Sequence, residues 1–174
     1  MAEIKNAKEA QELMQQAREA LIAKDYTQQI VLYNKMLELM PNDDDSFTSS
    51  SGKETYTKGG IYTFRGTSYG NLKQLEKAFA DFDKAISLDP KNYYAYYHRS
   101  FLYLEDGEME KAKADIEKAV ELNPKEAGSD YNTFAKSIRN LTGDKRTAAV
   151  YYKKSVEHGD FMGMSKSQLD KWGM

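Results

Sequence analysis

Small and apolar residues recur at helical spacing along much of the chain, with polar residues between them. One stripe covers 75–88, and a shorter one at 62–69 precedes it. The members of the longer stripe are Leu75, Ala78, Phe82, Ala85 and Leu88. Residues three or four apart share one face of an α-helix, and Pro90 ends the pattern, so each stripe predicts a short helix with one buried face. The two stripes together predict a helix, a turn and a second helix.

The segment from 59 to 125 repeats itself at a fixed offset. Residues of the first copy match residues 34 positions later, as in the pairs Tyr62/Tyr96, Arg65/Arg99, Tyr69/Tyr103, Ala78/Ala112, Asp81/Asp115 and Pro90/Pro124. A period between about 20 and 50 residues is typical of stacked supersecondary units. The repeat therefore predicts a chain of similar helix pairs, each of which buries its apolar face against the next.

This pattern resembles the tetratricopeptide repeat family. In that family a small residue at position 8, Tyr at 11, Ala at 20, an aromatic at 24, Ala at 27 and Pro at 32 define one helix-turn-helix unit. Numbered from Gly59 and from Tyr93, both copies fit, although Tyr62 and Tyr96 stand where the family often has Trp. The resemblance implies an all-α fold, a right-handed α-solenoid of antiparallel helix pairs. We expect a single domain over 1–174.

Two further units flank this pair. Residues 7–41 read as a diverged repeat with Ala17, Tyr33 and Pro41 at family positions, and 128–160 as another with Ala148 and Tyr152. The four repeats are thus expected at about 7–41, 59–92, 93–126 and 128–160. A capping helix is expected at about 163–173, and a tail that binds another protein is the alternative for this segment.

Residues 42–58 interrupt the period with 15 extra positions, since Pro41 and Pro90 are 49 residues apart. The segment is polar and small and lacks helical spacing, so we expect a mobile surface loop that proteases cut first. Ser51, Gly52 and Lys53 lack the earlier glycine of a phosphate loop, and Asp43 to Asp45 lack the later ligands of a calcium loop. We find no strand pattern in the chain and expect no sheet.

Charge and composition exclude several function classes. The formal net charge is -2, so the chain has no bulk attraction to nucleic acid or anionic membrane. The mean hydropathy is -0.77 and no stretch is apolar enough to span a membrane. Cysteine is absent. We expect a cytoplasmic protein, and an exported protein whose signal peptide has been removed is the alternative.

Chemistry-bearing residues are sparse. The only histidines, His98 and His158, belong to different repeats and have no second histidine or carboxylate at ligand spacing. We therefore predict no catalytic residue, no cofactor site and no metal site, and a protein that is not an enzyme.

The family resemblance also implies where a partner binds. In the family, the first helices of successive repeats line a groove, chiefly with positions 2, 5, 9, 12 and 13. The candidate partner-binding residues are Met14, Arg18, Thr63, Thr67, Tyr94, Tyr97, His98, Phe101 and Glu105. The set of Lys, Asn and Arg that clamps a C-terminal carboxylate in one subclass of the family is missing in either register.

Two functions follow from this groove. The first is an adaptor or scaffold module that binds a peptide or helix of a protein partner through Tyr94, Tyr97 and Phe101, which lie on one helical face. The second is a self-associating repeat protein whose aromatic surface is buried in a homo-oligomer. A third interpretation, that these aromatic residues belong to the core, stays open. The chain is expected to be a monomer or a weak homo-oligomer.

Overall fold

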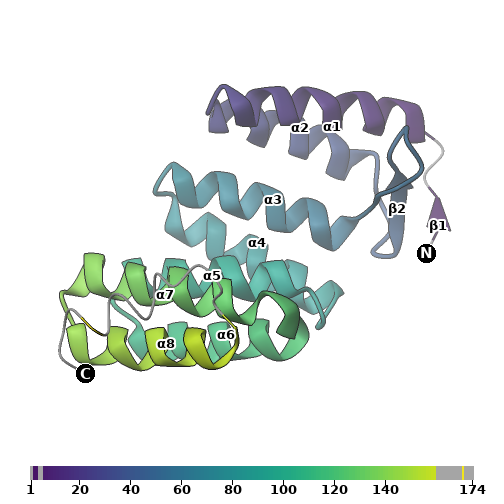
Figure 1. Cartoon of the computed structure of the whole chain (residues 1–174). Helices are drawn as coiled ribbons and strands as arrows, with labels where there is room; N and C mark the ends of the chain where they lie inside the picture. The colour runs from purple at the N-terminus through teal and green to yellow at the C-terminus, as the bar shows by residue number, and fades with distance from the viewer. Residues whose placement is uncertain (1, 4–5, 160–169, 171–174) are drawn as a thin grey trace. The chain divides into compact units, whose positions relative to one another are not determined.

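A computed structural model describes residues 2–3, 6–159 and 170 of the chain (Figure 1). The described residues form eight α-helices in succession. These are α1 (Ala7–Ile22), α2 (Tyr26–Glu38), α3 (Lys58–Asn71), α4 (Leu75–Leu88), α5 (Tyr93–Glu105), α6 (Met109–Leu122), α7 (Ala127–Thr142) and α8 (Lys145–Glu157), with a short 3-10 helix at Pro124–Glu126. The predicted all-α class of helix pairs is confirmed. The predicted capping helix falls, apart from residue 170, outside the described residues.

The chain divides into two compact units, 1–95 and 96–174, and the boundary falls inside α5. The core of the first unit is built from α1, α2, α3 and the buried ring of Phe47, whereas that of the second unit comes from α5 to α8. Within the first unit α1 packs on α2 and α3 packs on α4, and within the second α7 packs on α8. The extension of one domain over the whole chain stays a prediction.

Local sequence signals set the helix boundaries. The side chains of Asp25, Thr57 and Asp144 accept hydrogen bonds from the backbone N–H groups three residues later and so cap α2, α3 and α8. Within the second repeat, Gly66 lets α3 approach α4 closely, because a Cβ at this position would lie 3.1 Å from the ring of Phe82. This contact explains the small residue that the repeat pattern requires there.

A buried ion pair joins the two helices of the second repeat. The Nε and Nη2 atoms of Arg65 donate to the Asp81 carboxylate at 2.8 and 2.6 Å, and Nη1 donates to Oδ1 of Asn34 at 2.6 Å. The guanidinium carbon also lies 5.2 Å from the ring centroid of Tyr62 and 5.8 Å from that of Tyr69. Arg65 therefore links α3 to α4 within its repeat and to α2 of the preceding repeat.

The third repeat copies this arrangement. Arg99 donates to the Asp115 carboxylate through Nε at 2.7 Å and through Nη2 at 2.9 Å. Its guanidinium carbon lies 5.6 Å from the ring centroids of both Tyr96 and Tyr103. The 34-residue period of the sequence thus recurs as the same set of contacts.

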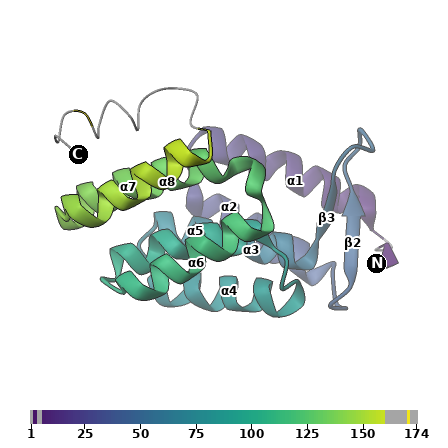
Figure 2. The same cartoon turned by 60° about the horizontal axis from the view of Figure 1, so that its bottom comes forward.

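The insertion between the first two repeats contains strands, so the predictions of an unstructured loop and of no sheet were wrong. Strands β2 (Asp45–Thr48) and β3 (Thr55–Thr57) pair antiparallel, and β1 (Ala2–Glu3) pairs parallel with β2. We call residues 45–57 the inserted hairpin; it lies beside the N-terminal end of α1 (Figure 2). At its base, the buried Lys58 donates to the carbonyl oxygen of Pro41 at 3.2 Å.

Candidate functional site

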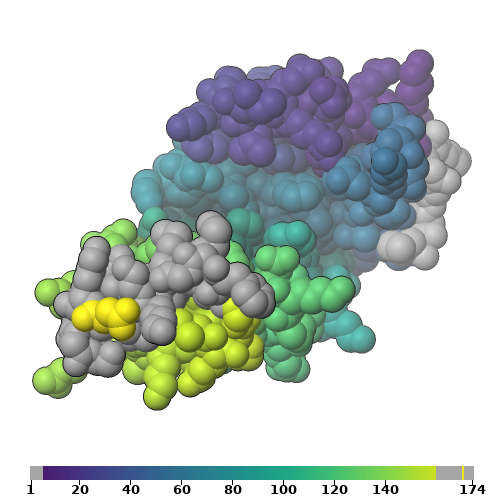
Figure 3. Space-filling view, in the orientation of Figure 1, coloured from purple at the N-terminus to yellow at the C-terminus, as the bar shows by residue number. Residues whose placement is uncertain are grey.

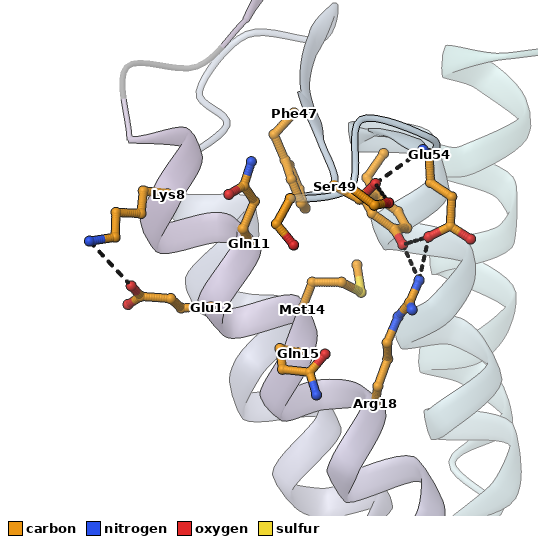
Figure 4. A pocket seen from close by; sticks show the side chains of 12 residues that line it. Lys8, Gln11, Glu12, Met14, Gln15, Arg18, Phe47, Ser49 and Glu54 are labelled. Carbon is orange, nitrogen blue, oxygen red and sulfur yellow. Dashed lines mark hydrogen bonds and ion pairs between the residues drawn. The ribbon is translucent and has the colours of Figure 1, made fainter.

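A pocket of about 590 Å³ lies between α1 and the inserted hairpin of the first unit (Figure 4). The helix contributes residues at successive turns of one face, among them Gln11, Met14 and Arg18. The hairpin contributes the opposite wall, including Phe47, Glu54 and Tyr56. The three α1 residues occupy positions 2, 5 and 9 of the first repeat, which line the groove in the family that the sequence resembles. The hairpin therefore stands against the predicted groove at this repeat.

Arg18 is held by two hairpin side chains. Its Nη2 atom lies 2.5 Å from Oε2 of Glu54 and also donates to the hydroxyl oxygen of Tyr56, whose own O–H donates to Glu54. Hydrogen bonds from Tyr56 and Arg18 hold the pKa of Glu54 below its usual range. Both partners of the ion pair remain half exposed, so the pair is accessible to solvent.

Two further contacts attach the hairpin to the helices. The Nε2 atom of Gln11 donates to the carbonyl oxygen of Thr48 at 2.6 Å. The Phe47 ring is fully buried, with its centroid 5.1 Å from that of Tyr56, which in turn lies 6.4 Å from the ring of Phe64 on α3. The hairpin is therefore packed into the first unit, and its residues are visible at the surface next to α1 (Figure 3).

Sequence reasoning missed the hairpin side of the site, although a signal was present. Ser46–Thr48 and Thr55–Thr57 each place one aromatic residue between two hydroxyl residues, and Gly52 lies in the segment that joins them. Alternation on both sides of a glycine-containing turn is typical of a β-hairpin. Gly52 has a φ of 70°, which favours glycine at this tip.

The two predicted site residues on α3, Thr63 and Thr67, form hydrogen bonds within the chain. Thr63 is 2% exposed; its Oγ1 donates to the carbonyl oxygen of Gly59 at 3.0 Å and accepts from Nδ2 of Asn92 at 2.9 Å. Thr67 is half buried and donates to the carbonyl oxygen of Thr63 at 2.9 Å. A role of Thr63 in partner contact stays a prediction from its repeat position; in the structure its hydroxyl joins α3 to the turn before α5. Met14 is also buried, at 6% exposed, and contributes to the pocket only as floor.

Most of the exposed large apolar side chains of the first unit belong to the first helices of the helix pairs. Leu21 and Ile22 of α1 are 54% and 84% exposed, Phe64 of α3 is 37% exposed, and Tyr94 of α5 is 60% exposed. Within the described part of this unit, Val31 on α2 is the one further large apolar residue of this kind, at 42%. Apolar residues with this much exposure are candidates for contact with a partner.

The remaining predicted residues lie in the second unit, and Tyr97, His98 and Phe101 among them are partly buried. Tyr97 and Phe101 are half buried and pack on the core, with ring centroids 4.9 Å apart and Phe101 5.9 Å from Phe134. Burial lowers the pKa of His98 to about 4, so its imidazole is neutral near pH 7. Glu105 is exposed. Packing of Tyr97 and Phe101 supports the interpretation that they contribute to the core.

Truncating these aromatic side chains to alanine shows whether they stabilise the core or face a partner. We expect Phe101→Ala to lower the free energy of unfolding by about 2 to 4 kcal/mol, because it removes a partly buried ring that packs on the core. Tyr103→Ala should cost a similar amount, whereas Tyr94→Ala should cost less than about 0.5 kcal/mol. Urea denaturation of the three variants measures this. A Phe101→Ala protein as stable as Tyr94→Ala would restore the prediction that Phe101 faces a partner.

Within 2–3, 6–159 and 170, no group of three or more His, Cys, Asp or Glu residues could hold a metal ion. No described helix combines the length and the apolar character needed to cross a membrane.

Comparison with known proteins identifies two of the repeats. Sequence models of the tetratricopeptide repeat match residues 61–92 and 93–126. No curated protein sequence matches the chain significantly.

Solved structures share the fold at low sequence identity. MamA from Desulfovibrio magneticus RS-1 is 23% identical over 84% of this chain and 73% of its own, with a TM-score of 0.62. The first tetratricopeptide domain of RPAP3, solved with the HSP90 peptide SRMEEVD, is 22% identical over 78% and 95%, with a TM-score of 0.61. The TPR2B domain of yeast Sti1, solved as a complex with pHsp70, is 19% identical over 86% and 98%, with a TM-score of 0.54.

Proposed function

We infer that this chain, a protein of the tetratricopeptide repeat family, is a non-catalytic protein-interaction module that binds a peptide or helix of a partner protein. The observation that carries this proposal is that Leu21, Ile22, Phe64 and Tyr94, which are exposed and apolar, all belong to the first helices α1, α3 and α5. These helices line the binding groove of the family, and anchors of protein interfaces are typically apolar or aromatic.

The relatives with solved ligands support a peptide as the binding partner. RPAP3 and Sti1 domains of this fold were solved with an HSP90 peptide and with pHsp70. Their identity to this chain is low, and the carboxylate clamp is missing here, so we do not transfer the chaperone tail as the ligand. The proposal is a peptide-binding adaptor or scaffold whose partner differs from theirs.

A peptide array tests the function directly. We expect the wild-type chain to bind a subset of fluorescein-labelled heptapeptides that carry one leucine or methionine, and Ile22→Gln and Tyr94→Gln to weaken this binding by about tenfold or more. Val31→Gln is the matched control, because Val31 is also exposed and apolar but lies on a second helix. Equal losses for Val31→Gln and Ile22→Gln would contradict a site on the first helices.

Self-association is the second candidate, and the same exposed residues favour it. In that case Leu21, Ile22 and Tyr94 would be covered by another copy of the chain. Sedimentation equilibrium distinguishes the two functions, because the adaptor is expected to be a monomer at micromolar concentration. A stable dimer that Ile22→Gln dissociates would support self-association instead.

A further inference from the structure

The inserted hairpin supplies a carboxylate to the groove face of α1. Arg18 occupies position 9 of the first repeat, and Glu54 forms an ion pair with it at 2.5 Å. The hairpin also accepts a hydrogen bond from Gln11, at position 2, through the carbonyl oxygen of Thr48. Two groove positions of the first repeat are thus already engaged by a segment of the same chain (Figure 4).

The carboxylate of Glu54 is more exposed to solvent than the buried side chains that anchor the hairpin. Its side chain is 55% exposed and it lies just before β3, next to the turn at Gly52. Phe47, by contrast, is fully buried and fixes the base of the same hairpin in the core. Ion pairs at exposed positions contribute little free energy because water competes with both partners. The carboxylate of Glu54 can therefore leave Arg18 without unfolding the hairpin.

The charge balance of the pocket defines the ligand. Two cations, Lys8 and Arg18, line it together with two carboxylates, Glu12 and Glu54, so the pocket is neutral with Glu54 in place. Departure of Glu54 leaves one net positive charge, and Arg18 then presents two N–H groups that match a carboxylate. An acidic ligand group is therefore the natural replacement.

The rest of the pocket suits a peptide. Met14, at 6% exposed, supplies an apolar surface on the α1 side, and the amides of Gln11 and Gln15 project from α1 beside it, whereas Phe47 is fully buried on the hairpin side. Amide side chains can both donate to and accept from a peptide backbone. A volume of about 590 Å³ falls in the range of typical ligand pockets and accommodates a few residues.

We propose that Glu54 is a built-in competitor for this pocket, and that the pocket takes an acidic peptide segment whose Asp or Glu carboxylate displaces Glu54 from Arg18. The apolar side chain next to that acidic residue then lies along the α1 side of the pocket, beside Met14. This inference rests on the proposed peptide-binding function and adds the chemistry and the regulation of the site in the first repeat.

The test uses the full chain and the heptapeptide array, with each peptide carrying zero to three glutamates and paired with its glutamine counterpart. We expect Glu54→Gln to tighten binding of the acidic peptides about two- to fivefold, because the competitor is removed while the side-chain shape is kept. Binding of the glutamine counterparts should not change. Arg18→Gln should weaken binding of the acidic peptides. In the double variant it should also abolish the gain in affinity that Glu54→Gln produces.

Glu12→Gln is the matched control. Glu12 lines the same pocket and pairs with Lys8 at 4.0 Å, so its loss changes the net charge equally but does not free Arg18. A gain from Glu12→Gln as large as that from Glu54→Gln would overturn the competition and leave only a general charge effect. If Glu54→Gln leaves peptide binding unchanged or weakens it, this inference is overturned but the proposed peptide-binding function is not. Failure of every variant to bind any peptide of the array would overturn the proposed function and this inference with it.

Discussion

Asp81→Ala is expected to lower the free energy of unfolding of the first unit by about 3 to 5 kcal/mol, one of the two largest effects we predict. Asp81 is the only carboxylate seen to accept from Arg65 among the described residues, and the two side chains are 7% and 19% exposed. Removing one partner of a buried pair leaves the other charge desolvated and unpaired, which costs much more than the pair itself contributes. Urea denaturation followed by circular dichroism measures the loss.

Two variants show whether the loss comes from the orphaned charge. Asp83→Ala, two residues along α4 and exposed, should cost less than about 1 kcal/mol. The double variant Arg65→Met/Asp81→Leu should recover part of the stability lost in Asp81→Ala, because it removes both charges. A loss below about 1 kcal/mol in Asp81→Ala would mean that water reaches Arg65.

Phe47→Ala is expected to destabilise the first unit by about 3 to 5 kcal/mol, since its ring is fully buried between the hairpin and the helices. Thr55→Ala is the control, because Thr55 is exposed on the neighbouring strand. Limited proteolysis gives a second readout. Within 42–57, elastase should cut the wild type first near the exposed tip at 50–53, and should cut throughout this segment in Phe47→Ala. A Phe47→Ala protein as stable as Thr55→Ala would return the segment to the status of a surface loop.

Repeat geometry is predictable from sequence because its contacts are local. The stripe from 75 to 88 gives the bounds of α4, and the matched residues at an offset of 34 give the equivalent helix α6. Within the second repeat, Gly66 packs against Phe82 of the second helix of the same repeat. One period of sequence therefore contains most of the information needed to fold one helix pair.

The inserted hairpin depends on contacts that no local pattern contains. Arg18 meets Glu54 across 36 positions and Gln11 meets Thr48 across 37. A polar segment looks solvated in the sequence unless the surface that receives it is known. For this reason the segment was interpreted as a mobile loop.

The family positions predict which side chains face the groove, but they do not show which other residues of the chain cover those side chains. Thr63 stands at a groove position, yet its hydroxyl oxygen accepts a hydrogen bond from the side-chain amide of Asn92. Tyr97 and Phe101 share a face of α5, yet Phe134 of α7 packs on that face. Position within the repeat therefore separates candidates from non-candidates, and only packing between helices decides which of the candidates remain accessible.

The recurring arginine between two tyrosines also fixes how far one helix can slide along the other. Arg65 meets Asp81 through two parallel hydrogen bonds, and Arg99 meets Asp115 in the same way. A shift of α4 by one turn, about 5.4 Å, would carry Asp81 out of reach of Arg65 and leave each charge without its oppositely charged partner. Leucine or alanine contacts tolerate such a shift far better, because they have no directional partner. The ion pair thus fixes the axial register of the two helices. A repeat that lacks the pair is expected to form both helices but not to hold them in one register.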